Sequence, residues 1–219
     1  MKMDSIRDKL PKTLYDTISA DFQELRPAQQ KAIEAGLFER KNLLICTPTA
    51  SGKTLIAELA MMHGIYNNIG KAVYIVPLKA LASEKYEYFK NKYKDLKVAL
   101  SIGDTDSSDS YLERYDIIIT VSEKLDSLIR HKAPWLRYVS TIIIDEVHLM
   151  NDPHRGPTLE IVITILRQVL KKAQFIALSA TIGNPKELAE WLDAGLVMDE
   201  WRPIELRKGI HLDGKIKFY

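Results

Sequence analysis

Six short apolar segments are spread along this chain, and they limit its fold more than any other feature of the sequence. They lie at residues 43–46, 72–77, 98–102, 116–120, 141–145 and 175–179. Each is nearly unbroken, which predicts strands that are apolar on both faces. Helical patterns separate most of them, at residues 79–92, 122–131 and 156–170. The alternation predicts a three-layer α/β fold, with a mostly parallel central sheet flanked by helices.

The two ends of the chain follow other patterns. In the first 21 residues apolar side chains recur at every fourth position, which predicts a helical lead-in that Pro11 interrupts. Further helices are expected at residues 27–40 and 185–192. Towards the C-terminus apolar and polar residues alternate around Asp213-Gly214, a hairpin-like turn. We therefore expect one domain at residues 1–202 and the beginning of another unit at 203–219.

The composition excludes several classes of protein. The chain has 219 residues, of which 46% are hydrophobic, enough for a sizeable core. No apolar run approaches the roughly 20 residues of a membrane span and the N-terminus lacks a secretion signal, so a cytoplasmic location is expected. The single cysteine, Cys46, excludes an internal disulfide and a cysteine-rich zinc site. A net charge of +2 does not by itself indicate a nucleic-acid binder.

The first apolar segment leads into a polar turn with the character of a phosphate-binding loop. A helical pattern follows the turn, and helix N-termini offer unpaired N–H groups and a positive dipole end to phosphate. Gly52, Lys53 and Thr54 add close backbone approach, an ammonium for the outer phosphates and a hydroxyl for Mg²⁺. Thr47 stands where the usual pattern has its first glycine. The alternative is a chance Gly-Lys-Thr at a strand-to-helix junction.

Two adjacent carboxylates end the apolar segment at 141–145. Asp145 is expected to hold Mg²⁺, and Glu146 to polarise the attacking water. Taken alone, the pair could be a capping feature after a strand. In parallel sheets, however, working residues gather beyond the carboxyl ends of the strands, so Lys53 and the two acids should meet around one triphosphate. Together they predict an ATP-hydrolysing site.

Other polar residues near the predicted strands are candidates for contacts with the nucleotide. Gln29 is placed to bond an adenine edge with Phe22 packed on the ring; the alternative is a solvated Gln and a core Phe. Ser179 and Thr181 close the last apolar segment, where their hydroxyls could bond the acidic pair and relay the state of the γ-phosphate. A plain turn is the alternative for these two residues.

Two predicted helix starts are candidates for holding a phosphodiester. One contains Lys79, and the other lies at 120–124 with Ser122 as the expected N-cap. Taken singly, such a segment is more often only a helix start. The further lysines between residues 85 and 97 are interleaved with acids, which predicts a solvated helix face. Residues 103–110 are expected to form a surface loop.

Taken in order, these residues resemble the first RecA-like lobe of the superfamily 2 helicases. The matching motifs are Pro27 with Gln29, TPTASGKT at 47–54, PLKALA at 77–82, TVSEK at 120–124, DEVH at 145–148 and SAT at 179–181. His148 is typical of the DExH-box division. Arg155-Gly156-Pro157 followed by Glu160 resembles the Ski-like group, and the loop followed by LIAE resembles the archaeal fork-repair DNA helicases. The resemblance covers residues 22–203.

The resemblance implies a role for each matched residue. The implied ATP-binding residues are Phe22, Gln29, Thr49, Ala50, Ser51, Gly52, Lys53 and Thr54. Thr54 and Asp145 would hold Mg²⁺, and Glu146 and Lys53 would be catalytic. The implied coupling residues are His148, Ser179 and Thr181, and the implied nucleic-acid contacts are Pro77, Lys79, Gly103, Thr120, Glu123 and Lys124. Two residues depart from the family pattern: Ala50 replaces a frequent glycine, and Phe22 replaces an aliphatic residue.

The resemblance also implies ligands, partners and a limit. The ligands are ATP and Mg²⁺, and the partner is single-stranded or branched nucleic acid, with DNA favoured over RNA. No second RecA-like lobe with arginine fingers follows in the sequence, and such fingers are worth roughly 10³ to 10⁵ in rate. The chain is therefore expected to be the N-terminal lobe of a longer helicase, nearly inactive alone. A small-molecule kinase and a self-sufficient ATP-sensing module are the alternatives.

Overall fold

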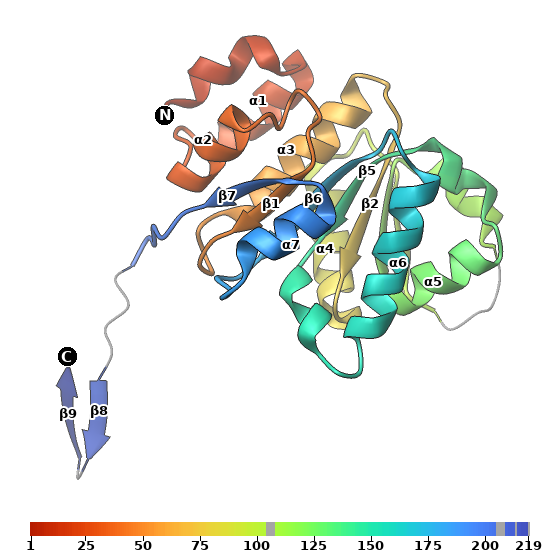
Figure 1. Ribbon diagram of the computed structural model, residues 1–219. Coiled ribbons are helices and arrows are strands. Elements are labelled where there is room, and N and C mark those ends of the chain that lie inside the picture. Colours follow the sequence, from red (N-terminus) through yellow and green to blue (C-terminus); the bar gives the residue numbers. More distant parts are fainter. Residues whose placement is uncertain (104–107, 205–208, 213, 219) are drawn as a thin grey trace.

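The computed structural model describes residues 1–103, 108–204, 209–212 and 214–218, and its centre is a seven-stranded sheet (Figure 1). The strands are β1 (Leu43–Cys46), β2 (Lys71–Val76), β3 (Val98–Ser101), β4 (Ile117–Val121), β5 (Val139–Ile144), β6 (Gln174–Ser179) and β7 (Gly195–Met198). Their order is β3-β4-β2-β5-β6-β1-β7, and all neighbouring strands are parallel. The expected parallel sheet is confirmed.

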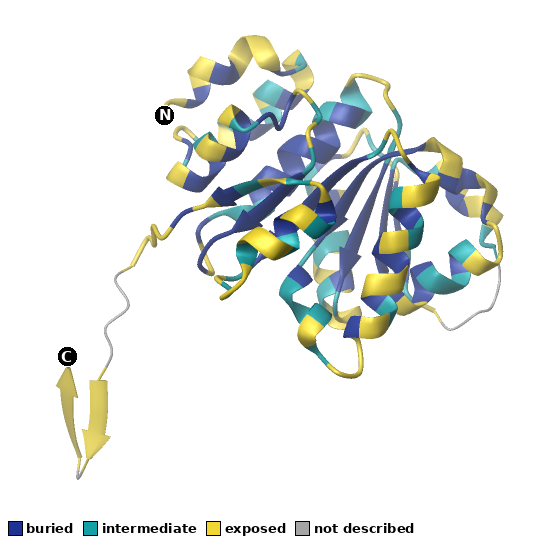
Figure 2. Ribbon diagram, viewed as in Figure 1, coloured by how far each residue is buried: buried dark blue, intermediate teal, exposed yellow. Residues whose placement is uncertain are grey.

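Helices cover both faces of this sheet (Figure 1). On one face lie α1 (Lys12–Asp21), α2 (Pro27–Glu34), α3 (Lys53–Tyr66) and α4 (Lys79–Lys92). On the other lie α5 (Ser122–Arg130), α6 (Gly156–Val169) and α7 (Pro185–Leu192). Successive strand residues alternate between the two layers, since Leu43 and Ile45 join the first core and Leu44 and Cys46 the second. Figure 2 shows the sheet buried between them, which confirms the three-layer architecture.

The strand register brings several loops to one edge of the sheet. Cys46 at the end of β1 lies beside Ser179 at the end of β6. Ile144 at the end of β5 lies beside Ala177 of β6 on one side and Ile75 of β2 on the other. The loops that follow β1, β2, β5 and β6 therefore open onto a common edge. Ligands of open α/β sheets bind outside this carboxyl edge.

The N-terminal lead-in consists of two helices. The 3₁₀ helix η1 (Met3–Lys9) ends before Pro11, which is the N-cap residue of α1. Proline cannot continue the hydrogen-bond ladder of a helix, so the break falls where the sequence predicted an interruption. The expected end of α2 at residue 40 is wrong. The helix ends at Glu34, because Gly36 takes a left-handed conformation with φ of 109°.

Two further expectations are wrong in detail. The N-cap of α5 is Val121, and Ser122 is the first helical residue, with its Oγ 3.2 Å from Oε2 of Glu123. The sequence patterns also missed β7, the edge strand beside β1. Gly195 and Met198 at its ends are exposed, so this strand has no continuous apolar run to mark it. The remaining 3₁₀ helices are η2 (Ser110–Arg114), η3 (Pro134–Tyr138) and η4 (Val147–Asn151).

The C-terminal residues form an antiparallel hairpin of β8 (Gly209–Leu212) and β9 (Lys215–Phe218), as the alternating pattern predicted. All its described residues are exposed, and Figure 1 shows it apart from the sheet. Gly214 in the turn has φ of 75°, whereas its partner Asp213 lies outside the described residues, as do 104–107 of the expected surface loop. Within the described ranges, no helix is long and apolar enough to cross a membrane.

Candidate nucleotide site and nucleic-acid groove

The loop between β1 and α3 has a backbone that fits an anion. Ala50 and Gly52 have positive φ angles of 65° and 94°, and the buried hydroxyls of Thr47 and Ser51 lie 2.7 Å apart. Among the backbone hydrogen bonds of the described residues, none uses three adjacent N–H groups, those of Gly52, Lys53 and Thr54. These donors lie at the positive end of α3. They form the kind of cradle that a phosphate group occupies.

The Lys53 side chain lies at the same edge of the sheet as the acidic pair. Its Nζ donates to the carbonyl oxygens of Thr47 (2.8 Å) and Pro48 (3.1 Å). Burial lowers the pKa of this ammonium, and the charges of Glu146 and Asp145 oppose that shift. The structure thus brings together three charged groups that the sequence placed after separate strands. An anionic ligand here would meet an ammonium that is already partly desolvated.

The side chain of Gln29 links the start of α2 to the loop by hydrogen bonds. Its side chain is 2% exposed, with Nε2 donating to the Gly52 carbonyl (3.1 Å) and Oε1 accepting from the Arg26 N–H (2.8 Å). A Cβ at position 52 would lie 2.3 Å from this Nε2, and the φ of 94° is one that residues with a side chain rarely adopt, so this position favours glycine. Arg26 donates to the Ala50 carbonyl and lies over the Trp201 ring. Because the Gln29 amide is buried and engaged at both atoms, its contact with adenine stays a prediction.

Asp145 and Glu146 lie where β5 ends and the chain turns into η4. The Tyr74 hydroxyl donates to Oδ2 of Asp145 at 3.0 Å, and the Glu146 N–H donates to Oδ1 at 3.1 Å. Glu146 has a left-handed backbone with φ of 52°, which redirects the chain after the strand. Both carboxylates are half-buried. Each is thus oriented by the protein while keeping a side open to a hydrated ion.

The donor set around the loop fits magnesium. In the described part of the chain, no group of three or more His, Cys, Asp or Glu side chains is gathered for a metal. Mg²⁺ needs no such cage, since it keeps several waters and takes one or two protein ligands beside phosphate oxygens. Asp145 and the Thr54 hydroxyl are the groups available for that purpose. Lys85 lies near Thr54, with its Nζ 3.5 Å from Oγ1 of Thr54, although the charge pattern predicted a solvated helix face.

His148 connects the acidic pair to the end of β6. Its Nδ1 lies 3.3 Å from Oε2 of Glu146 and accepts the Ala180 N–H at 3.4 Å. The expectation that the Ser179 and Thr181 hydroxyls bond the acidic pair is wrong. The Ser179 hydroxyl is buried beside Cys46, and among the described residues neither it nor the exposed Thr181 hydroxyl bonds Asp145 or Glu146. A coupling role for these three residues stays a prediction, with His148 as the observed link.

A groove of about 720 Å³ lies beyond the ends of β2, β3 and β4. Five of the residues predicted to contact nucleic acid line it, namely Pro77, Lys79, Gly103, Glu123 and Lys124. The start of α4 and the start of α5 form two of its walls. These five residues, distant in sequence, therefore share one concave surface at the carboxyl edge of the sheet.

Two of the predicted nucleic-acid residues are already engaged within the protein. The Thr120 side chain is fully buried and donates to the Ser101 carbonyl at 2.7 Å. Thr120 was expected to contact a nucleic-acid strand. For its side chain that expectation is wrong, because β4 directs the hydroxyl into the sheet. Lys124 is 4% exposed, and its Nζ lies 3.0 Å from Oδ2 of Asp109. A nucleic-acid phosphate would have to compete with that carboxylate.

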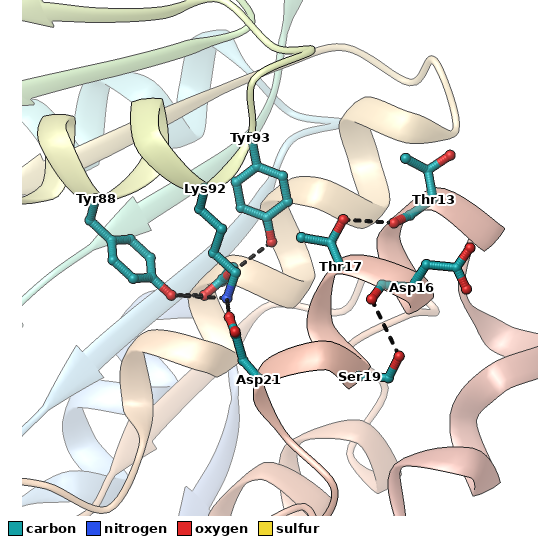
Figure 3. A network of polar contacts seen from close by, with 9 residues as sticks. Thr13, Asp16, Thr17, Ser19, Asp21, Tyr88, Lys92 and Tyr93 are labelled. Atoms are coloured by element: carbon teal, nitrogen blue, oxygen red, sulfur yellow. Dashed lines mark hydrogen bonds and ion pairs between the residues drawn. The ribbon is translucent and has the colours of Figure 1, made fainter.

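A buried polar network that sequence reasoning missed joins α3, α4 and the end of α1 (Figure 3). Glu58 on α3 is 1% exposed and accepts hydrogen bonds from the hydroxyls of Tyr93 (2.5 Å) and Tyr88 (2.9 Å). Lys92 lies 2.9 Å from Glu58 and 2.8 Å from Asp21. The signal was present in the sequence, because a glutamate inside the apolar run LIAELAMM needs a partner once it is buried.

Phe22 lies at the border of this network. It is half-buried, and Nζ of Lys92 lies 5.2 Å from the centre of its ring. Since α3 begins at the phosphate loop, the network fixes Phe22 relative to the helix that carries Lys53 and Thr54. Contact between Phe22 and adenine stays a prediction. Its position beside the loop helix is compatible with that role.

Comparison with known families decides where this chain belongs. The family described as DEAD/DEAH box helicase matches residues 26–188 of the 219. The chain belongs to the DEAD/DEAH box helicase family. The matched region contains the phosphate loop, the groove residues, the acidic pair and the end of β6. The resemblance to the first RecA-like lobe of superfamily 2 helicases is thereby confirmed.

Relatives of this helicase-family chain include two archaeal proteins named ATP-dependent DNA helicase Hel308. The protein of Methanococcus vannielii is 53% identical over 204 residues, which cover 90% of this chain and 27% of that protein. The protein of Methanocaldococcus jannaschii is 55% identical over 203 residues, which cover 89% of this chain and 17% of that protein. The chain thus spans only about a sixth to a quarter of the length of these relatives.

Solved structures show the same fold. The DUF1998 helicase MrfA bound to DNA superposes with a TM-score of 0.77 at 29% identity, covering 88% of this chain and 30% of that one. The same helicase bound to DNA and AMPPNP gives a TM-score of 0.76 at 29% identity, over 88% of this chain and 30% of that one. The RecA-like α/β architecture expected from the sequence is confirmed.

Proposed function

We propose that this chain is the N-terminal ATP-binding lobe of an ATP-dependent DNA helicase or translocase. The main support is a loop with three unused N–H groups at the start of α3, beside a Lys53 ammonium near enough to Asp145 and Glu146 for their charges to act on its pKa. This combination suits a magnesium-bound triphosphate better than any other common ligand. The names of the Hel308 relatives agree with the proposal.

Each group at the loop has a defined task in this proposal. The N–H groups and the Lys53 ammonium bind the phosphates, while Thr54 and Asp145 hold Mg²⁺. When bound, the ion neutralises charge on the phosphate oxygens. Glu146 orients the attacking water and accepts its proton. Thr49, Ala50, Ser51 and Gly52 supply the shape of the loop.

The remaining predicted residues act around this centre. Phe22 and Gln29 contact adenine. His148, which touches both Glu146 and the backbone at Ala180, couples the nucleotide to the end of β6 together with Ser179 and Thr181. Single-stranded or branched nucleic acid lies in the groove, and DNA is favoured over RNA because the relatives are named DNA helicases. We also propose a cytoplasmic location, because a single buried free cysteine agrees with a reducing compartment.

Hydrolysis and unwinding are proposed to need more than these residues. The Hel308 relatives are several times longer than the matched region. A second RecA-like lobe would supply arginine groups to the γ-phosphate, a contribution worth roughly 10³ to 10⁵ in rate. We therefore propose that residues 1–202 form one motor lobe and that 203–219 lead towards a second. The lobe alone would bind Mg-ATP and turn it over very slowly.

Two measurements on this chain test the proposal. Titration with a fluorescent ATP analogue should show saturable binding that EDTA weakens and that Lys53→Ala abolishes. ATP turnover in the presence of single-stranded DNA should stay well below about 1 s⁻¹, the low end of ordinary enzyme rates. Absence of nucleotide binding would overturn the proposal. Turnover above that rate would overturn the need for a second lobe, and phosphate transfer to a small molecule would favour a kinase.

A further inference from the structure

We propose that Arg155 forms an additional phosphate-binding position in the groove, holding the backbone of a nucleic-acid strand across from Lys79. The inference rests on the proposed function of the groove. Arg155 is not among the six residues that the resemblance implied as nucleic-acid contacts. In the sequence, Arg155-Gly156-Pro157 resembled the Ski-like group, but that resemblance gave Arg155 no chemical role.

Arg155 and Lys79 reach the groove from opposite sides of the sheet. Both line the cavity, Lys79 at the first position of α4 and Arg155 at the N-cap of α6. α4 belongs to the helix layer on one face and α6 to the layer on the other. The two cationic side chains therefore flank the carboxyl edge. A nucleic-acid strand that follows this edge would pass between the two side chains.

The charges that line the groove make Arg155 decisive for an anionic ligand. The charge of Lys124 is compensated by Asp109 at 3.0 Å. In the formal charge of the lining, the positive charge of Lys79 is offset by that of Glu123, an exposed acid on the neighbouring wall. Arg155 is then the lining residue that gives the described surface its net positive charge. It is exposed, and within the described residues its guanidinium makes no hydrogen bond or ion pair.

A tight turn holds Arg155 in place before any ligand arrives. Oδ1 of Asp152 accepts the backbone N–H groups of His154 and Arg155, both at 2.9 Å. These two hydrogen bonds lower the pKa of Asp152, so the turn persists at neutral pH. The Arg155 backbone is thereby ordered, and only its side chain needs to settle on a ligand. Less conformational entropy is lost on binding when the backbone is preorganised in this way.

Gly156 explains why the pattern continues with a glycine. Its N–H donates to the Asp152 carbonyl at 2.8 Å, and a Cβ at this position would lie 2.0 Å from the Met150 carbonyl oxygen. No side chain fits, so α6 starts directly against η4. This close approach sets the position of Arg155 relative to the groove. Glycine is thus required for packing, and arginine for binding.

The chemistry of arginine suits a phosphodiester at this place. A planar guanidinium donates two parallel hydrogen bonds to phosphate oxygens, which fixes the geometry of the contact as well as adding attraction. Such a contact reads no base sequence. It would hold the strand in position, as most backbone contacts in protein–nucleic acid complexes do. The inferred ligand is therefore the sugar–phosphate backbone itself.

Salt-dependent binding tests the proposal directly. Fluorescein-labelled oligothymidylate is titrated with this chain by fluorescence anisotropy at several salt concentrations. Each phosphate contact to a single strand contributes about 0.7 to the slope of log K against log salt. Arg155→Gln should reduce the slope by about 0.7 and weaken binding about tenfold at low salt. Arg155→Lys should keep the slope, since the charge is retained.

The matched control is Arg137→Gln. Arg137 is exposed on η3, which precedes β5 and so lies at the opposite edge of the sheet. This variant should bind as the wild type does. An unchanged slope in Arg155→Gln, or an equal loss in Arg155→Lys, would overturn the inference while the groove assignment stands. Absence of salt-dependent binding by the wild type would overturn the groove assignment and the inference together.

Discussion

The hydroxyl of Tyr74, in the middle of β2, donates a 3.0 Å hydrogen bond to Oδ2 of Asp145 at the end of β5. Tyr74 is fully buried, and burial together with the charge of Asp145 raises the pKa of its hydroxyl well above the usual value. The phenol therefore stays protonated and acts as a fixed donor. One oxygen of the proposed magnesium ligand is thus oriented from inside the core.

Tyr74→Phe should weaken magnesium-dependent nucleotide binding without unfolding the protein. Loss of one such hydrogen bond is expected to cost about 1 kcal/mol, or roughly fivefold in affinity. The measurement is a Mg²⁺ titration at a fixed concentration of fluorescent ATP analogue. Tyr93→Phe is the control, because it removes a buried hydroxyl that bonds Glu58 instead. An equal effect of both variants on the Mg²⁺ titration would show that Tyr74 has no specific role.

Lys53→Ala should abolish ATP binding while leaving the empty protein about as stable as before. The ammonium is desolvated and bonded to two loop carbonyls, so its removal takes away little that supports the core. In the wild type, ATP at about 100 times its Kd should add about 2.7 kcal/mol of stability, a shift of several degrees in Tm. Thermal melts with and without Mg-ATP measure both quantities, with Lys171→Ala as a surface control. A large drop in the Tm of the empty variant would mean that Lys53 is structural.

Lys92→Met should destabilise the fold strongly, because it leaves the carboxylate of Glu58 buried without its cation. Breaking a buried pair by removing one partner typically costs about 3–5 kcal/mol. Urea denaturation provides the free energy of unfolding, and Lys90→Met on the exposed side of the same helix is the matched control. The double variant Glu58→Gln with Lys92→Met should recover part of the loss. A cost below about 1 kcal/mol, as for surface pairs, would contradict the structure.

The same network predicts a loss of stability in alkali. Burial and the charge of Glu58 raise the pKa of Tyr88 to about 12, and that of Tyr93 is raised by the same causes. Burial opposes the charge of Lys92, but Glu58 and Asp21 raise its pKa overall. In the folded state these groups keep protons that the unfolded chain releases near pH 10. The free energy of unfolding should therefore be level up to about pH 10 and fall above it.

Chemical denaturation between pH 8 and pH 11.5 tests this dependence. The variant Glu58→Gln removes the charge that raises all three pKa values, so its stability should fall less steeply above pH 10. Absorbance of ionised tyrosine reports the same titration in the folded state. A wild-type stability that rises with pH in this range would have the wrong sign for the network.

The sequence was sufficient for six of the seven strands and for the closeness of Lys53 to the acidic pair, for a physical reason. Strands buried on both faces are marked by unbroken apolar runs, and parallel strands end at one edge, so Lys53 and Asp145 had to lie near each other. The inward orientation of Thr120 could not be predicted, because in such a strand both faces are apolar and neither marks the outside. The edge strand β7 was missed since only Val197 in it is buried.

Contacts between separate elements were also beyond the sequence patterns. The pairing of Lys124 with Asp109 and that of Glu58 with Lys92 each join different elements, so they depend on how those elements pack. The same holds for Tyr74, which in β2 was one apolar strand residue among several. Helix ends were predicted less well than helix positions, as the early end of α2 at Glu34, two residues before the left-handed Gly36, shows.

Cys46 is the sole cysteine of the chain, and it lies in β1 with 2% of its surface exposed. Burial raises the pKa of its thiol, so at neutral pH it is neither reachable nor ionised for alkylation. The natural protein therefore serves as its own background for maleimide chemistry. Ala80→Cys, on the exposed lining of the groove, would carry a single fluorophore that reports when a strand arrives, with no other position to remove first.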